Sequence, residues 1–356
     1  MPAKPNNLLT NRLNFLVKNV FMSKVVTRTF LGAIMLNLFL FLANQNRIYL
    51  IILVICICLG VIYEVITVAT PQNEKFPINK GLCVYFVSII FWYKVALSLI
   101  LLYMKYNAIN FITNLRIIVF ALYSFGLVLF VSSLEKSKLS KQLLILTIVH
   151  MVSYIGGLTC NVATKNISFS KFFFIFPCLL VIINDIGAYF IGKYFGKRPL
   201  IAISPNKTIE GFFGGFLFTL VGGLLCIYLK MAGILLPDEH DQKLSIPLNS
   251  NLWYLNFPII YIHGLSFICA ASFLAPFTGF IASAIKRVFK KKDFGSLIPG
   301  HGGITDRMDC QLIMVYFTCY YLKATSLSPH STALSIYSFI LRNLTRDEFM
   351  ELKNMM

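Results

Sequence analysis

Residues 48–68 read IYLIILVICICLGVIYEVITV, an apolar run in which the only charged residue is Glu64. A helix needs roughly 20 apolar residues to cross the hydrocarbon core of a bilayer. Eight other runs have similar character, at 29–45, 81–104, 116–133, 142–163, 172–191, 209–230, 256–282 and 310–327. The pattern predicts an all-α polytopic membrane protein with about nine transmembrane helices. The run at 256–282 is long enough to tilt, or to break at Pro276.

The composition agrees with a membrane protein and with a polyanionic partner. The chain is 57% hydrophobic and 13% charged, whereas soluble domains carry about 25% charged residues. Its net charge of +18 exceeds what cytoplasmic loops need for orientation, and the remainder suits lipid headgroups or phosphate-bearing substrates. Because no basic soluble domain is present, we expect no nucleic-acid partner.

The distribution of charge predicts the topology. If the basic tail at 1–28 is cytoplasmic, alternation places the connections at 69–80, 134–141, 192–208 and 283–309 on the same side. The last three are rich in Lys and Arg, and the connection at 231–255, assigned to the far side, is mainly acidic. This follows the positive-inside rule. We therefore divide the chain into a tail at 1–28, a transmembrane catalytic domain at 29–327 and a C-terminal tail at 328–356, with an amphipathic helix at about 333–354.

The connection at 283–309 reads SAIKRVFKKKDFGSLIPGHGGITDRMD and is dense in both signs of charge. Ser283, Lys286 and Arg287 would lie on one face of a helix that continues from the eighth span. Asp306 and Asp309 are three residues apart, so on a helix they project from one face. Carboxylates hold a hard cation through oxygen, and Lys and Arg neutralise phosphate. The stretch therefore predicts magnesium-dependent phosphoryl chemistry.

A second polar stretch begins at Asp185, in or just after the sixth span. Charges inside a membrane usually face the bundle interior or an aqueous cavity. Further on, Ser204 followed by Pro205 suits a helix N-cap with Pro at the first helical position. Free amides, a hydroxyl and Lys207 at a helix N-terminus form a natural phosphate site. An ordinary capped helix is the alternative, and Glu210 could bond back to the turn or carry out chemistry.

Two further charges, Glu64 and Lys94, fall within the second and third predicted spans. Such residues can form a structural ion pair, or their side chains can extend to the membrane interface. We expect structural roles for both.

The stretch from Ser283 to Asp309 resembles the signature of the phosphatidate cytidylyltransferases, also called CDP-diacylglycerol synthases. That signature reads Ser-x-x-Lys-Arg, four residues, Lys-Asp, a short apolar stretch and Pro-x-His-Gly-Gly-x-x-Asp-Arg-x-Asp. The segments at 184–189, 196–200 and 204–211 also match the family, and Ala-Pro-Phe-x-Gly-Phe at 275–280 is typical of its eukaryotic endoplasmic-reticulum branch. Bacterial members often carry Gly-Asp-Leu-x-Glu-Ser where residues 278–283 read Thr-Gly-Phe-Ile-Ala-Ser. Because those carboxylates are absent here, Asp185 is expected to bear more of the metal binding.

The resemblance implies that CTP and phosphatidic acid react to give CDP-diacylglycerol and pyrophosphate. It implies a site in a polar cavity that faces the cytoplasm, in a homodimer of the endoplasmic-reticulum membrane. Mg²⁺ would be held by Asp306, Asp309 and Asp185, and His301 would position a phosphate or act as an acid. The substrate phosphates would be bound by a larger set, comprising Lys286, Arg287, Arg307, Lys207, Ser204, Thr208, Glu210, Ser283 and Lys292.

Two alternatives remain open at this point. A lipid kinase of the dolichol kinase type would also use CTP, but it would release CDP in place of pyrophosphate. A transporter could line an anion path with intramembrane charges. Transporters tend to carry paired repeats with broken helices, and no internal repeat is visible in this sequence.

Overall fold

The computed structural model describes residues 24–70, 78–103, 108–204, 207–236, 259–297 and 302–325. Within these ranges the chain is helical throughout, apart from its connections. Most of both predicted tails, the amphipathic helix at 333–354 and His301 lie outside the described residues. The helices are α2 (Lys24–Asn44), α3 (Arg47–Ala69), α4 (Lys80–Tyr103), α5 (Ala108–Ser132), η1 (Lys136–Lys138), α6 (Leu139–Phe169), α7 (Lys171–Phe195), α8 (Ile209–Met231), α10 (Ile259–Cys269), η2 (Ala270–Leu274), α11 (Ala275–Val288) and α12 (Thr305–Ala324).

Seven described segments are long and apolar enough to cross a membrane, and they start at Arg47, Lys80, Phe111, Lys136, Lys171, Ile209 and Ile260. The prediction of a polytopic α-helical protein is confirmed. The other two predicted spans, at 29–45 and 310–327, coincide with α2 and α12, which are helical but do not meet the same criterion. In α2 only the shorter part Phe30–Asn44 qualifies as apolar, and α12 carries several charges. The count of nine spans therefore stays a prediction.

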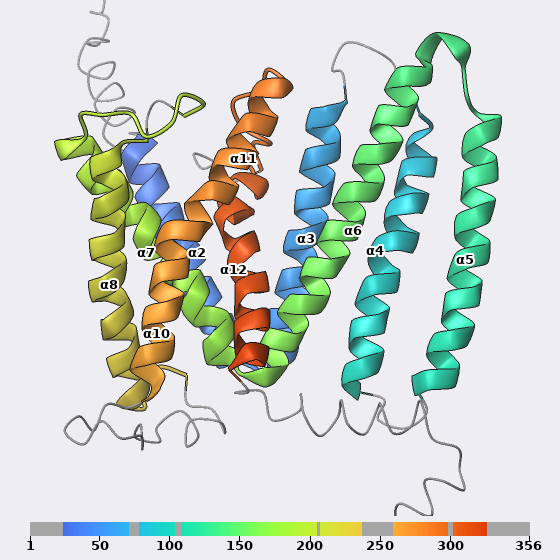
Figure 1. Cartoon of the computed structure of the whole chain (residues 1–356). Coiled ribbons are helices and arrows are strands. Elements are labelled where there is room, and N and C mark those ends of the chain that lie inside the picture. Colours follow the sequence, from blue (N-terminus) through green and yellow to red (C-terminus); the bar gives the residue numbers. More distant parts are fainter. Residues whose placement is uncertain are drawn as a thin grey trace, which may run out of the picture.

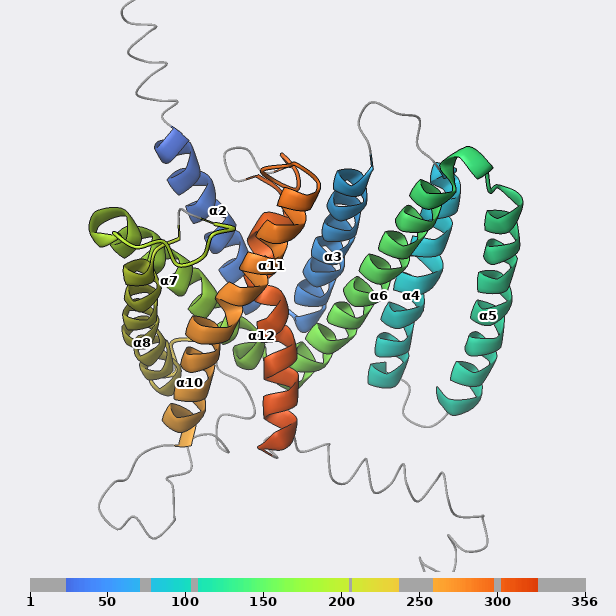
Figure 2. The ribbon, with the colours of Figure 1, turned by 45° about the horizontal axis from the view of Figure 1, so that its top comes forward.

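The connections that carry the predicted site lie at one end of the bundle. Figures 1 and 2 show the turn between α5 and α6, the connection between α7 and α8, and the connection between α11 and α12 at the same end. These are three of the four connections that the sequence analysis assigns to a common side. The helices α3 to α8 alternate in direction, as the predicted topology requires.

Two large apolar cores hold the helices together. One joins α7, α8, α10, η2 and α12 around Phe172, Phe176 and Phe267. The other joins α3, α4, α6 and α7 around Leu50 and Phe91. Large apolar side chains on the outside of the bundle are exposed, among them Phe120 and Val221. Outward apolar side chains of this kind are expected of helices that face lipid.

A π-helical turn interrupts the long apolar helix that ends at Val288. The helix is regular over α10, widens at η2 and continues regularly as α11, with Pro276 at its start. Proline lacks an N–H and clashes with the preceding turn, so a helix adjusts locally around it. The predicted break at Pro276 thus takes the form of a widened turn, and wide turns of this kind often occur next to functional sites.

The start of α8 differs from the sequence prediction. Ser204 lies in a turn, in which its own N–H donates to the Ile201 carbonyl oxygen at 3.2 Å. An antiparallel bridge between Pro199 and Thr208 gives the connection an extended, hairpin-like form. The helix therefore starts only after Thr208. Thr208 is the N-cap, and its hydroxyl accepts the Gly211 N–H at 3.1 Å. The prediction of a Ser204–Pro205 cap was wrong.

Replacement of the observed cap should destabilise the protein more than replacement of the predicted one. We expect Thr208→Ala to cost about 1 kcal/mol, the usual value for loss of an N-cap hydroxyl. Ser204→Ala should stay within about 0.5 kcal/mol of the wild type. Thermal unfolding of the purified protein in detergent compares the two variants. A lower melting temperature for Ser204→Ala than for Thr208→Ala would contradict the assignment.

Candidate active site

Three elements bring predicted site residues together around Gly279 of α11. A methyl group on Gly279 would lie 2.9 Å from Cys310 Sγ, 3.4 Å from Lys207 Nζ and 3.5 Å from Asp309 Oδ2. The α7–α8 connection and the first turns of α12 therefore meet closely over Gly279, where a larger residue would require the Cys310 side chain to shift. Gly279 lies in the segment 275–280 that resembles the family, and no role was predicted for it from the sequence.

Asp185 of α7 completes this group, which we call the central cluster: Asp185, Lys207, Asp309 and Arg307. Asp185 interacts electrostatically with all three of the other members, and Asp309 also interacts with Lys207 and with Lys286. The Lys207 ammonium lies 4.6 Å from the centre of the Phe280 ring, and a ring face attracts a cation at that distance. Asp185 and Arg307 are exposed, and Lys207 and Asp309 are half-buried. The cluster therefore lies partly at the surface of the described helices.

Asp306 lies next to the central cluster and is bound by its own set of donors. Lys286 Nζ donates to Asp306 Oδ1 at 2.7 Å, in a pair whose side chains are only 13% and 8% exposed. The other oxygen, Oδ2, accepts the backbone N–H groups of Phe294 at 2.9 Å and Gly303 at 3.1 Å. A carboxylate with three donors ties the connection between α11 and α12 to both helices. The sequence pattern identified Asp306, and the structure adds these partners.

Asn184, the neighbour of Asp185, fixes the position of α7 at the site. Its side-chain amide donates to the Ala271 carbonyl oxygen in the π-helical turn at 3.3 Å. Its carbonyl oxygen accepts the Thr219 hydroxyl of α8 at 3.3 Å. A methyl group on Gly215 would lie 2.5 Å from that oxygen, so α8 packs closely on Asn184. Asn184 lies in the segment 184–189 that matches the family, and this function was not predicted from the sequence.

Several predicted substrate-binding side chains contact other parts of the protein. The Ser283 hydroxyl donates to the Gly279 carbonyl oxygen, and the Arg287 guanidinium donates to the Lys291 carbonyl oxygen. Glu210 accepts the N–H groups of residues 197 and 198, so it bonds back to the loop, as one of the two predicted alternatives states. Lys292 is exposed. Together with Thr208 and Ser204, these side chains organise the connections around the central cluster.

The central cluster offers oxygen ligands to a cation. Among the described residues, no three His, Cys, Asp or Glu side chains form a group that could hold a metal ion by themselves. Mg²⁺ does not require such a group, because it is usually bound through one or two carboxylates together with waters and substrate phosphates. Asp185 and Asp309 interact with each other and repel, and a divalent cation would relieve that repulsion. The carboxylates of Asp185 and Asp309 therefore fit Mg²⁺. The Asp306 carboxylate differs from them, because it already accepts three hydrogen bonds from the protein.

The two membrane charges outside the signature have separate structural contacts. Glu64 accepts two backbone N–H groups at the start of α12. The Lys94 ammonium lies 4.7 Å from the centre of the Tyr154 ring. The predicted structural roles agree with these contacts, but the suggested ion pair between Glu64 and Lys94 does not form.

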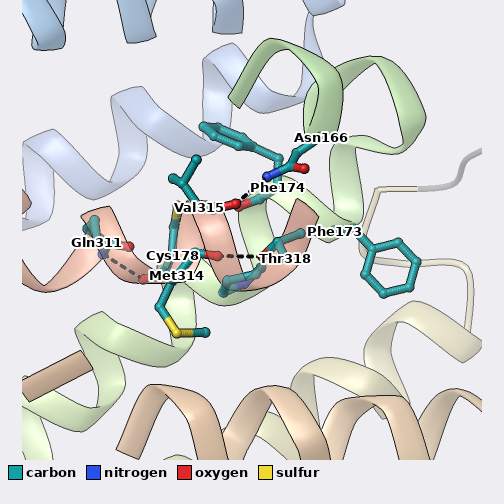
Figure 3. A pocket seen from close by; sticks show the side chains of 9 residues that line it. Asn166, Phe173, Phe174, Cys178, Gln311, Met314, Val315 and Thr318 are labelled. Carbon is teal, nitrogen blue, oxygen red and sulfur yellow. Dashed lines mark hydrogen bonds between the residues drawn. The ribbon is translucent and has the colours of Figure 1, made fainter. Parts of the chain in front are cut away.

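A small recess lies deeper in the bundle, between α6, α7 and α12. Figure 3 shows Asn166, Cys178, Gln311 and Thr318 around it, and the Gln311 amide donates to the Cys178 carbonyl oxygen at 3.2 Å. Its cavity volume of about 10 Å³ leaves room for about one water molecule and is far below the roughly 300 Å³ at which ligand pockets begin. The recess is therefore too small to hold a nucleotide.

Comparison with known proteins gives a consistent result. The sequence model of the cytidylyltransferase family matches residues 26–325. A phosphatidate cytidylyltransferase of Encephalitozoon cuniculi is 36% identical over 92% of this chain and 84% of its own length. The phosphatidate cytidylyltransferase of Saccharomyces cerevisiae is 38% identical over 81% of this chain and 69% of its own length. Human phosphatidate cytidylyltransferase 2 is 32% identical over 86% of this chain and 76% of its own length.

Proposed function

This chain belongs to the cytidylyltransferase family, and we propose that its central cluster is the site at which a cytidylyl group is transferred. The protein is a phosphatidate cytidylyltransferase, which converts CTP and phosphatidate to CDP-diacylglycerol and pyrophosphate. The observation that carries the proposed site is the convergence of Lys207 and Asp309 on Gly279, with Asp185 beside them.

The reaction needs positioning and charge neutralisation more than proton transfer. An oxygen of the phosphatidate phosphate attacks the α-phosphorus of CTP, and the bond from that phosphorus to the β-phosphate oxygen breaks. A phosphate monoester has a second pKa of about 6, so the attacking group is already ionised near neutral pH. Pyrophosphate leaves with the bonding electrons. Side chains that align the two phosphates and neutralise their charge are therefore sufficient for catalysis.

Within this scheme the members of the central cluster have distinct functions. Lys207 binds the phosphates from its position over the Phe280 ring, and Arg307 contributes a second positive charge. Asp185 and Asp309 would hold Mg²⁺. When bound, the ion would polarise the phosphate oxygens and stabilise the charge of the leaving group. Mg²⁺ dependence is thus part of the proposal.

Lys286 and Asp306 support the cluster from the side. Their ion pair and the two amides on Asp306 fix the first turn of α12, one turn before Asp309. Because Lys286 also interacts with Asp309, its charge acts on the metal-binding carboxylate as well. We assign to this pair the orientation of Asp309.

The environment of the site is proposed from the charge pattern and the family. The end of the bundle that bears the cluster carries the basic connections, and the positive-inside rule assigns basic connections to the cytoplasm. CTP would reach the site from that side, and phosphatidate would enter from the adjacent leaflet. The endoplasmic reticulum as the membrane, and a homodimer as the assembly, are expectations from the eukaryotic branch of the family.

An assay of the full-length protein in detergent tests the proposal. Radiolabelled CTP, phosphatidate and Mg²⁺ should yield label in the lipid phase as CDP-diacylglycerol, with an equal amount of pyrophosphate in the aqueous phase. Chelation of divalent cations with EDTA should abolish turnover, and excess Mg²⁺ should restore it. Formation of CDP and a phosphorylated lipid would indicate a kinase, and full turnover in EDTA would refute the metal assignment.

A further inference from the structure

Glu64 of α3 is a buried carboxylate. Its side chain binds the start of α12, the helix that bears Asp309, and its partner Thr305 lies 241 residues away in the sequence. Glu64 is 2% exposed. Removal of a carboxylate from water costs several kcal/mol unless hydrogen bonds or opposite charge compensate it. The partners of this carboxylate therefore indicate what it does.

Both oxygens of Glu64 accept backbone N–H groups of α12. Ile304 N donates to Oε1 and Thr305 N donates to Oε2, each at 2.8 Å. The first N–H groups of a helix have no partner inside the helix, and a negative charge there is favoured by the helix dipole. Ile304 is the N-cap residue of α12 and provides no side-chain cap. Glu64 thus supplies, from another helix, the cap that the local sequence lacks.

The surrounding backbone is shaped to admit this carboxylate. A methyl group on Gly303 would lie 2.5 Å from Glu64 Oε2, and one on Gly295 would lie 2.6 Å from Oε1. On α3, a methyl group on Gly60 would lie 2.6 Å from the Ile304 side chain. A side chain at any of these glycines would require the Glu64 or Ile304 side chain to shift. The fit is an observation independent of the hydrogen bonds.

Glu64 and Asp306 together accept three consecutive backbone N–H groups at the start of α12. Gly303 N donates to Asp306, and the next two N–H groups donate to Glu64. These three consecutive amides are therefore used by protein carboxylates and do not bind substrate phosphate. They fix the position and direction of the first turn of α12, from which Asp309 projects one turn later.

From these contacts we infer that Glu64 is a positioning residue for catalysis, which acts by holding Asp309 in register with Lys207 and Asp185. The inference rests on the proposed function, because it assigns the central cluster to the reaction. Glu64 itself does not contact the reacting groups. An error of 1 Å in the position of a catalytic group can cost up to about 100-fold in rate, so loss of the anchor should appear in turnover.

The first test replaces Glu64 by glutamine, which keeps the shape but points an amide N–H₂ at one of the two backbone N–H groups. We expect Glu64→Gln to lower kcat about tenfold and to raise the Mg²⁺ concentration for half-maximal rate, per molecule of monodisperse enzyme. Glu135→Gln is the matched control, since Glu135 is an exposed carboxylate at the same end of the bundle, paired with Lys138. It should match the wild type. A purely stabilising Glu64 would lower the yield and the melting temperature with unchanged kcat and Mg²⁺ response, and that result would overturn the inference.

The second test uses the glycine contact and leaves the carboxylate in place. Gly303→Ala should push the carboxylate away and lower kcat about as much as Glu64→Gln. In a Glu64→Ala background, the same Gly303→Ala change should have little further effect, because the obstructing side chain is gone. If the effects of Gly303→Ala and Glu64→Ala on kcat were additive, the inference would be contradicted. This test does not depend on whether Glu64→Gln folds. Wild-type activity tests the proposed function separately, whereas the ratios of variant to wild-type activity test Glu64.

Discussion

Asp309→Asn should reduce kcat by about 10²- to 10³-fold while the protein remains folded and inserted, because a neutral amide cannot replace a carboxylate as a ligand of a hard cation. Asp309 lies where the α7–α8 connection meets α11, and it interacts with Lys207 and Lys286. Its Oδ1 accepts a hydrogen bond from the N–H of the adjacent Cys310, a contact that an asparagine can keep. The measurement is CDP-diacylglycerol formation as a function of Mg²⁺ concentration.

Asp306→Asn provides an informative comparison with this variant. Asp306 Oδ2 accepts two backbone N–H groups and Oδ1 accepts the Lys286 ammonium, so the change removes the charge that pairs with Lys286. Loss of one partner from a buried pair typically costs about 3–5 kcal/mol. Asp306→Asn should therefore lower the melting temperature as well as the activity, whereas Asp309→Asn should lower the activity alone. Full activity in Asp309→Asn would exclude it as a metal ligand.

The helical architecture could be predicted because lipid leaves a spanning chain few options. A continuous apolar run such as 48–68 has to satisfy its backbone internally, and α3 spans Arg47–Ala69 accordingly. The spacing of Asp306 and Asp309 puts them on one face if they lie on a helix, and both lie at the start of α12. Such predictions depend on short-range periodicity, which the sequence displays directly.

The contacts that build the site were harder to predict from the sequence, because they join segments that are distant along the chain. Ser204–Pro205 has good local chemistry for an N-cap, yet the bridge between Pro199 and Thr208 delays the start of α8. The role inferred for Glu64 depends on the backbone N–H groups of residues 304 and 305, and a backbone donor leaves no residue-type signal in the sequence. The division between Asp306, which has three donors, and Asp309, which faces Lys207, likewise requires coordinates.

The proposed site would also explain how the fold can serve two substrates of opposite solubility. Asp185 projects from a helix long and apolar enough to span the membrane, whereas Lys207 lies on the connection that leaves it. A lipid phosphate at the interface and a soluble nucleotide can therefore meet between a helix and a loop. The π-helical turn at 270–274 and the Asn184 contacts keep these elements in fixed relation.

Lys207→Met should lower kcat/KM for CTP by at least about 100-fold, because the positive charge of the lysine interacts with both Asp185 and Asp309 and lies over the Phe280 ring. Methionine keeps much of the length and the apolar stem but removes the charge. Lys207→Arg should retain more activity than Lys207→Met, since a guanidinium also binds phosphate and stacks on an aromatic ring. The measurement is steady-state kinetics with CTP and phosphatidate varied separately.

Lys193→Met is the matched control, because Lys193 is an exposed lysine of α7 at the same end of the bundle, near the Tyr189 and Tyr194 rings. General loss of positive surface charge would affect both variants equally and would weaken with salt, since exposed charges are screened over about 10 Å at 0.1 M ionic strength. A specific role of Lys207 predicts a large loss in Lys207→Met alone, which persists at high salt. Equal effects of the two substitutions would remove Lys207 from the site and leave only long-range attraction of the polyanionic substrates.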